Sequence, residues 1–295
     1  MRIIQMFHYN FKEIIPLLPK IKEQGFDYIQ ISPCNGTKQD NRDWKEFWIQ
    51  YQPINLKIGN KQVGTKDELI ELCSKAKEFN IGIIADVVLR HVATCNYNNT
   101  KPHELVDKAL IKFIVNRPRL FNDNNRFDVI NNNTGMPMLD YENKEYQQLV
   151  INYLDELLEC GISKFRLDQY KHYSLPNEFN QGTFVKNVMG RYPKDIWIGE
   201  VLFENDKKLL NEFTKYAYVH SMNGLQDNDK IVRAIENHDT YLNNDGVGYT
   251  KFINDDIIIS EYKHLCSYSK HTMFYCRPFN DSWLNPIIKS ANLNI

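Results

Sequence analysis

The sequence lacks long apolar runs and an excess of charge of either sign. No apolar stretch has the roughly 20 residues that a transmembrane helix needs, and residues 1–8 (MRIIQMFH) are too interrupted for the apolar core of a signal peptide. Lysine and arginine number 36 against 37 aspartates and glutamates, which leaves a net charge of −1. We therefore expect neither a nucleic-acid nor a membrane partner.

The six cysteines are also few and scattered, with no C-x-x-C pair among them. Most lie in apolar segments of helix or strand character, where a buried, reduced thiol is usual. We expect a cytoplasmic protein without disulfides.

Short β-like runs alternate with amphipathic helical stretches along most of the chain. Residues 82–88 are nearly all apolar, which is typical of a buried parallel strand. The expected strands are residues 3–7, 28–32, 82–88, 164–167, 196–200, 218–221, 231–236 and 272–276. The expected helices are residues 12–24, 66–79, 143–159, 177–189 and 255–267. Eight strands alternating with helices predict an α/β fold, a (β/α)8 TIM barrel.

Three segments interrupt this regularity. The stretch 93–139 is polar and rich in asparagine, and we predict that it forms a small inserted B subdomain after the third strand. The barrel then comprises residues 1–92 and 140–295. Little sequence separates Glu200 from Asp239, and about twenty residues follow Cys276, so we expect a barrel trimmed near strand 6 and helix 8.

Charged side chains collect where the expected strands end. Asp86, Arg166, Asp168, Glu200 and Asp239 all fall at or just after such ends. The carboxyl ends of barrel strands form the catalytic face of this fold. Charged groups there cost desolvation free energy unless they pair or take part in chemistry, so this rim is the expected active site.

The same segments resemble the four short sequence regions of the α-amylase superfamily of glycoside hydrolases (family 13 type). They are residues 86–91 (DVVLRH), 161–172 (GISKFRLDQYKH), 197–201 (WIGEV) and 234–239 (AIENHD). Residues 47–53 (FWIQYQP) are similar to the aromatic loop that lines the cleft of amylases. Each motif alone is weak, but all of them in the family's order are highly specific.

The resemblance implies roles for ten residues. Asp168 is expected to be the nucleophile, Glu200 the general acid and base, and Asp239 the residue that stabilises the oxocarbenium-like transition state. Arg166 is expected to keep Asp168 ionised and oriented. The residues expected to bind sugar are His91, His238, Tyr51 and Trp48 in the cleft, and Lys171 and His172 on the leaving-group side. Asp86 is expected to hold Arg166 rather than to react.

The chain departs from the family where a structural calcium is usual. The asparagine that commonly precedes the histidine of the first region is Arg90 here, and Met138 aligns with a common aspartate ligand, although Asp140 is close by. A guanidinium would repel a cation from this place. We therefore predict no cofactor and no calcium of the usual kind, with Arg90 filling its place.

The sequence favours a hydrolase that cleaves α-1,4-glucosidic bonds of starch, glycogen or maltooligosaccharides. Two alternatives remain open: a maltogenic amylase or transglycosylase of the same superfamily, and a non-catalytic glucan-binding protein. The usual C-terminal β-sandwich is expected to be missing, which makes a homodimer plausible because apolar surface could be exposed.

Overall fold

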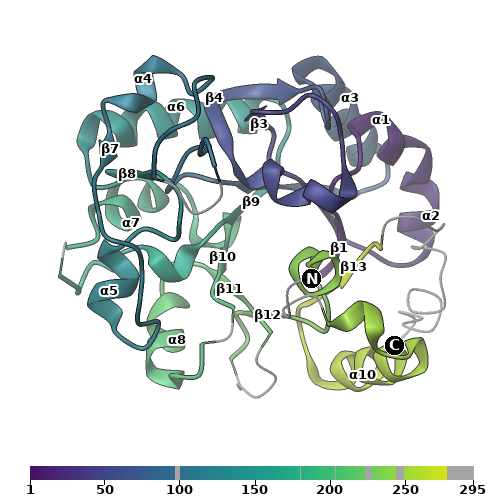
Figure 1. Ribbon diagram of the computed structural model, residues 1–295. Helices are drawn as coiled ribbons and strands as arrows, with labels where there is room; N and C mark the ends of the chain where they lie inside the picture. The colour runs from purple at the N-terminus through teal and green to yellow at the C-terminus, as the bar shows by residue number, and fades with distance from the viewer. Residues whose placement is uncertain (97–99, 180, 203, 223–227, 244–248, 278–295) are drawn as a thin grey trace.

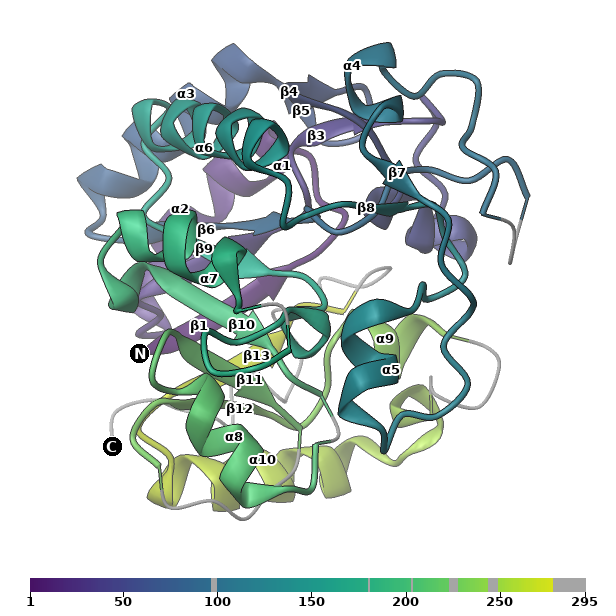
Figure 2. The same ribbon diagram turned by 90° about the vertical axis from the view of Figure 1, so that its left-hand side faces the viewer.

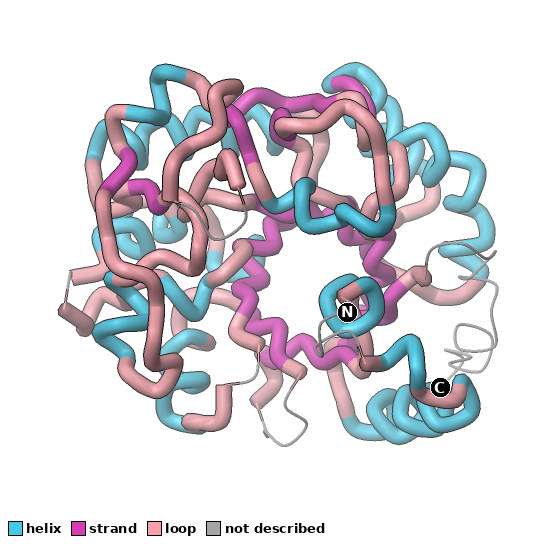
Figure 3. The backbone as a smooth tube through the Cα atoms, viewed as in Figure 1, coloured by secondary structure: helices cyan, strands magenta, loops and turns pink. Residues whose placement is uncertain are grey.

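The eight parallel strands close into a barrel in the computed structural model, which confirms the fold predicted from the sequence. The structure describes residues 1–96, 100–179, 181–202, 204–222, 228–243 and 249–277. Viewed along its axis, the barrel is a ring of strands surrounded by helices (Figures 1 and 3). In order around the ring the strands are β1 (Arg2–Met6), β2 (Tyr28–Ile31), β6 (Gly82–Val87), β9 (Lys164–Leu167), β10 (Trp197–Glu200), β11 (Tyr218–Ser221), β12 (Ile231–Ala234) and β13 (Thr272–Tyr275).

Helices of two lengths accompany the strands, and the longer ones cover the outside of the ring and bury one apolar face each. The longer ones are α3 (Lys66–Glu78), α6 (Lys144–Glu159) and α10 (Asp255–Tyr268). Thr65 caps α3, with its side chain accepting a hydrogen bond from the Glu68 amide at 3.2 Å. The shorter ones are α1 (Phe11–Ile14), η1 (Ile15–Leu17), α2 (Leu18–Glu23), α7 (Thr183–Asn187), η4 (Met189–Arg191), η5 (Lys194–Ile196), α8 (Lys207–Phe213), α9 (His238–Leu242) and η6 (Thr250–Phe252).

Two small antiparallel sheets lie outside the barrel. One consists of β3 (Asn35–Thr37), β4 (Pro53–Asn60) and β5 (Gly64–Thr65), with η2 (Trp44–Tyr51) between β3 and β4. The other pairs β7 (Ile114–Val115) with β8 (Met138–Leu139). Segment 93–139 also holds α4 (Lys108–Ile111) and α5 (Arg126–Asn131). Figure 2 places β7, β8 and α5 at the barrel end opposite the N-terminus.

Two expectations for local structure were wrong. No strand was expected between residues 32 and 82, but the β3–β4–β5 sheet lies there. The helix expected over 177–189 is limited to α7 and η4, because Gln181 and Gly182 have positive φ angles of 58° and 49°. Two successive left-handed residues cannot belong to a right-handed helix. Strand 6 is present as β11, with residues 222–230 alone linking it to β12, and the expected short helix 8 lies outside the described residues.

An apolar layer fills the inside of the barrel and supports a polar layer above it. Its members come from five of the eight strands: Ile3, Ile84, Ile198, Val232, Ala234 and Met273. Side chains of a strand alternate between its two faces, so Asp86 lies inside the barrel one step above Ile84. Asp86 is also directly opposite Arg166 in the register of β6 with β9. The polar layer therefore lies toward the carboxyl ends of the strands.

Candidate active site

A buried guanidinium joins three carboxyl groups at the mouth of the barrel. Arg166 is 1% exposed, and its Nη1 donates to both oxygens of Asp86 at 2.9 and 3.0 Å. The same nitrogen lies 3.3 Å from Asp168 Oδ1, and Nη2 donates to Glu200. The pairing of Asp86 with Arg166 is as the sequence predicted.

The three adjacent strands β6, β9 and β10 position this cluster. Arg166 is opposite Asp86 on one side and Ile198 on the other. Asp168 comes two residues after Arg166, just past the end of β9, and Glu200 comes two residues after Ile198, at the end of β10. Because every second residue points the same way, the register brings all four charged groups to one place.

Burial and mutual repulsion shift the acid–base equilibria of these groups. Burial raises the pKa of Asp86 to about 6, against the favourable contacts with Arg166 and Tyr51. Burial, followed by the negative charge of Glu200, raises the pKa of Asp168 well above its usual range, and Arg166 opposes this shift. Burial also raises the pKa of Asp239. Asp168 therefore holds a proton more readily than an isolated carboxyl group would.

Stacked rings form the opposite side of the site. The His238 ring packs against Phe7, at 4.4 Å between ring centroids, and against Tyr51, at 5.0 Å, and the Phe7 and Tyr51 rings are 5.7 Å apart. Burial lowers the pKa of His238 to about 3, so the ring is neutral. Gln5 on β1 fixes it twice, through a 3.0 Å contact with His238 Nδ1 and a 3.2 Å bond that the His238 amide donates to Gln5 Oε1.

Tyr51 links this aromatic side to the charged cluster. Its hydroxyl donates to Asp86 Oδ2 at 2.7 Å, and its ring centroid lies 5.7 Å from the Arg166 guanidinium carbon. His91 Nε2 lies 2.8 Å from the Tyr51 carbonyl oxygen. Burial lowers the pKa of His91 to about 4, so a neutral ring donates this hydrogen bond. The Tyr51 backbone and side chain are therefore both held in place.

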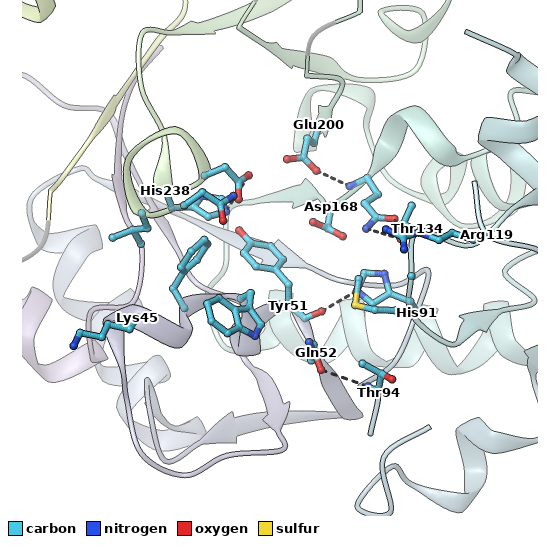
Figure 4. A pocket seen from close by; sticks show the side chains of 18 residues that line it. Lys45, Tyr51, Gln52, His91, Thr94, Arg119, Thr134, Asp168, Glu200 and His238 are labelled. Carbon is cyan, nitrogen blue, oxygen red and sulfur yellow. Dashed lines mark hydrogen bonds and ion pairs between the residues drawn. The ribbon is translucent and has the colours of Figure 1, made fainter. Parts of the chain in front are cut away.

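A cavity of about 730 Å³ opens over these groups. Figure 4 shows Asp168 and Glu200 on one side of it and Tyr51 and His238 on the other, with Lys45 and Arg119 at opposite ends. Seven of the ten residues expected in the site line this cavity: Trp48, Tyr51, His91, Asp168, Glu200, His238 and Asp239. The eighth, Arg166, lies beneath them.

The last two expected residues, Lys171 and His172, lie apart from the lining of this cavity. They form part of η3 (Tyr170–His172), the turn that follows Asp168. The Lys171 ammonium is 3.2 Å from Glu204, and His172 Nδ1 lies 3.0 Å from the Val129 carbonyl oxygen. Their expected contact with sugar stays a prediction.

Three residues of the site were not predicted from the sequence. Gln5 is one, because a lone glutamine on the first strand carries no pattern. Gln169 is another: its backbone has a left-handed φ of 52°, and its amide donates to Glu200 Oε2 at 2.7 Å. The third is His220 on β11, opposite Glu200 in register and 1% exposed. The expected strand order places His220 next to Glu200, and this could have indicated from the sequence that His220 belongs to the site.

Residues 10–235 match the family model of the alpha-amylase catalytic domain. The chain belongs to the α-amylase family of glycoside hydrolases. The match includes Asp168 and Glu200 and ends shortly before Asp239.

Relatives in sequence and in structure agree with this family. The chain is 29% identical to an alpha-amylase of Clostridium acetobutylicum, over 84% of this chain and 36% of the relative. It is 23% identical to an alpha-amylase of Butyrivibrio fibrisolvens, over 96% of this chain and 35% of the relative. This α-amylase-family chain therefore spans about a third of the length of these curated relatives.

Solved structures share the fold. The alpha-amylase of Geobacillus thermoleovorans complexed with acarbose superposes with a TM-score of 0.72 at 18% identity, over 99% of this chain and 76% of that one. Alpha-amylase I of Eisenia fetida superposes with a TM-score of 0.74 at 16% identity, over 97% of this chain and 70% of that one.

Within the described residues, no helix is long and apolar enough to cross a membrane.

Proposed function

We propose that this chain is a retaining glycosidase that cleaves α-1,4-glucosidic bonds in starch- or glycogen-like glucans and maltooligosaccharides. The observation that carries the proposal is that Asp168 and Glu200 contact one guanidinium beneath a cavity of about 730 Å³. Carboxyl groups that share a guanidinium lie close together. Retaining enzymes need such closeness, roughly 5–5.5 Å, whereas inverting enzymes separate the pair by about 6.5–9.5 Å.

In the first step, an oxygen of the Asp168 carboxylate attacks the anomeric carbon, and the bond from that carbon to the glycosidic oxygen breaks. Glu200 gives its proton to the departing oxygen. The step requires a protonated Glu200 and an ionised Asp168, because Glu200 acts as the acid and Asp168 as the nucleophile. The product of the step is a glycosyl ester on Asp168.

In the second step, water attacks the anomeric carbon, Glu200 takes the proton of the water, and the Asp168 carboxylate leaves. Arg166 favours the ionised form of Asp168 in both steps, because it contacts Oδ1 at 3.3 Å. Asp239 lines the same cavity and is proposed to hold sugar hydroxyls as positive charge develops on the ring. The neutral rings of His91 and His238 are proposed to hydrogen-bond the same sugar unit.

The α-linked substrate class is supported by the names of the relatives, which are alpha-amylases. A neutral glucan also suits a cavity whose aromatic side carries Tyr51 and Trp48, because ring faces pack against sugar rings. The test is the release of reducing ends from soluble starch by the purified chain, with the anomer of the first product recorded by proton NMR.

We expect the α-anomer to appear first, and the Asp168→Asn variant to release none. Product with inverted configuration, or starch left unchanged by a folded wild-type chain, would overturn the proposal. Long products formed from maltooligosaccharides would instead assign the site to transglycosylation.

A further inference from the structure

A second buried arginine lies outside the catalytic cluster. Arg90 follows β6 and is 1% exposed, yet no aspartate or glutamate of the described residues forms an ion pair with it. Its Nη2 donates to two backbone carbonyl oxygens, Ile130 at 3.0 Å and Asn132 at 2.8 Å. A buried charge is costly unless it is compensated, and these two carbonyl oxygens are the hydrogen-bond acceptors that compensate it.

Both carbonyls belong to the end of α5. The last carbonyls of a helix lack partners within the helix and must find them elsewhere. The Val129 carbonyl is contacted by His172 Nδ1 at 3.0 Å, and the Tyr141 hydroxyl lies 3.4 Å from the Ile130 oxygen. Arg90 therefore supplies the charged part of a cap that connects α5 to the barrel.

The family resemblance places a calcium ligand at the position of Arg90. Calcium is bound by oxygen atoms, including backbone carbonyls, in a shell of about 6–8. Here a guanidinium stands in place of one expected ligand and donates to the Ile130 and Asn132 carbonyls. Two cations cannot share one set of oxygens without strong repulsion. The residues at this place therefore do not fit a calcium ion of the usual family kind.

The end of α5 leads directly into a wall of the catalytic cavity. Asn132 is the C-cap of α5, and Thr134, Gly135 and Met136 line the cavity. The Asn133 side chain accepts a bond from the Gly135 amide at 2.9 Å. The side-chain amide of Gln169 donates to the Thr134 hydroxyl at 3.3 Å, and the backbone amide of Gln169 donates to Glu200. A shift of the Asn132 carbonyl would therefore move groups that contact the proposed acid.

We propose that Arg90 is a built-in cation that fastens the end of α5 to the barrel, so that this wall of the cavity is positioned without a bound calcium ion. Arg90 is thus a positioning residue, since it holds the segment that leads into this wall and does not line the cavity itself. The proposal concerns the protein's own fold and metal response, and its first test is independent of the proposed function.

The first test is the melting temperature of the purified wild-type chain with calcium chloride, with EDTA and with neither. We expect the same melting temperature in all three conditions, because anything that binds the native state would raise it. A rise with calcium, a fall with EDTA, or calcium retained after dialysis would overturn the proposal.

The second test removes the charge with Arg90→Gln and keeps it with Arg90→Lys. We expect Arg90→Gln to lower the melting temperature by roughly 5 °C or more, since two buried carbonyls lose a charged donor. Arg90→Lys should recover part of this loss. The matched control is Arg191→Gln, which removes an arginine that is 52% exposed and paired with Asp155 at 3.0 Å, and which should behave like the wild type.

Local readouts separate a positioning role from a merely structural one. Amide hydrogen exchange in Arg90→Gln should quicken across residues 126–139 and stay unchanged in β10 and β11. With starch as substrate, kcat/KM should fall by roughly tenfold at temperatures where the variant is folded. If amide exchange in Arg90→Gln is as slow at residues 126–139 as in the wild type, or if it is faster to the same degree across the whole chain, the proposal is contradicted. This holds whether or not the chain cleaves starch.

Discussion

Two arginines, each 1% exposed, lie near the mouth of the same barrel in opposite surroundings. Arg166 is in contact with three carboxyl groups, whereas Arg90 donates to backbone carbonyls alone. Burial disfavours the charge of both. For Arg166 the carboxylates outweigh burial and raise its pKa well above the usual range, but for Arg90 burial dominates and lowers the pKa.

The difference separates two uses of a buried positive charge. The Arg166 region concentrates groups whose protonation can change, as acid–base chemistry requires. The acceptors that Arg90 contacts are backbone dipoles, which orient the chain and do not titrate. The effects of changes to the first region should therefore depend on pH and act directly on catalysis. Changes to the second region should affect catalysis only through the order and stability of the cavity wall.

The largest effect is expected from Glu200→Gln. The amide has almost the size of the acid but cannot deliver a proton, so turnover of starch should fall by at least roughly 10³-fold. Binding of a maltooligosaccharide, measured by calorimetry, should stay close to that of the wild type. Hydrolysis at a near-normal rate would remove Glu200 from the role of acid and weaken the contrast between the two regions.

Arg166→Met should come next. It leaves Asp86, Asp168 and Glu200 buried without their shared cation, which should cost about 3–5 kcal/mol of unfolding free energy. Because protonated carboxyl groups need no cation, urea unfolding should show a smaller loss at acidic pH than at neutral pH. For Arg90→Gln, by comparison, the loss should be the same at both. Equal pH dependence in the two variants would contradict the expected difference between the Arg166 and Arg90 regions.

A third effect concerns Asp86 and the pH dependence of stability. Its pKa is about 6 in the folded chain against an ordinary value of 3.8, so between these values the folded state binds more protons than the unfolded state. The contribution of Asp86 to stability is therefore greatest below about pH 4 and falls as pH rises to about 6. The full change is up to about 3 kcal/mol, at about 1.4 kcal/mol for each pKa unit.

Asp86→Asn removes this titration. Subtracting the variant's unfolding free energy from that of the wild type, at a series of pH values, isolates the contribution of Asp86 from that of all other acids. A difference that grows with rising pH across this window would show that the sign is wrong.

The smallest effect is expected from Tyr51→Phe. It deletes the 2.7 Å hydrogen bond to Asp86 and keeps the ring stacked on His238, so a stability loss of about 1 kcal/mol is expected. Tyr51→Ala, which also removes the ring, serves as the comparison and should raise KM for maltooligosaccharides well beyond the Phe variant. If the two variants have the same KM, the ring does not contact sugar.

The sequence predicted the barrel because each strand carries a local apolar signal, and it predicted Asp86, Arg166, Asp168 and Glu200 because they end such strands. It did not predict Gln5 as the partner of His238, because that contact depends on closure of the ring. Nor did it indicate that Lys171 would pair with Glu204, since long flexible side chains take their direction from the surrounding fold.

The irregular segments were harder for a different reason. The β3–β4–β5 sheet is held by long-range pairing, such as Thr37 with Pro53, and polar residues in short strands resemble those of loops. Arg90 was recognised from the residue type alone, but its two carbonyl partners could be named only once α5 had been placed. Contacts between a side chain and a distant backbone leave no trace in either local sequence.

The closure of the ring through β1 and β13 has a consequence for the order in which the site is assembled during synthesis. The contact of Gln5 with His238 joins residues 233 positions apart, whereas Asp86, Arg166 and Glu200 come from three strands that are neighbours in the ring. While the chain is being made, β1 has its partner β2 early, but its other edge stays unpaired until residues 272–275 have emerged. The nucleophile and the acid can thus be brought together first. The His238 side chain, and with it Asp239, takes its final position only when the last strand closes the barrel.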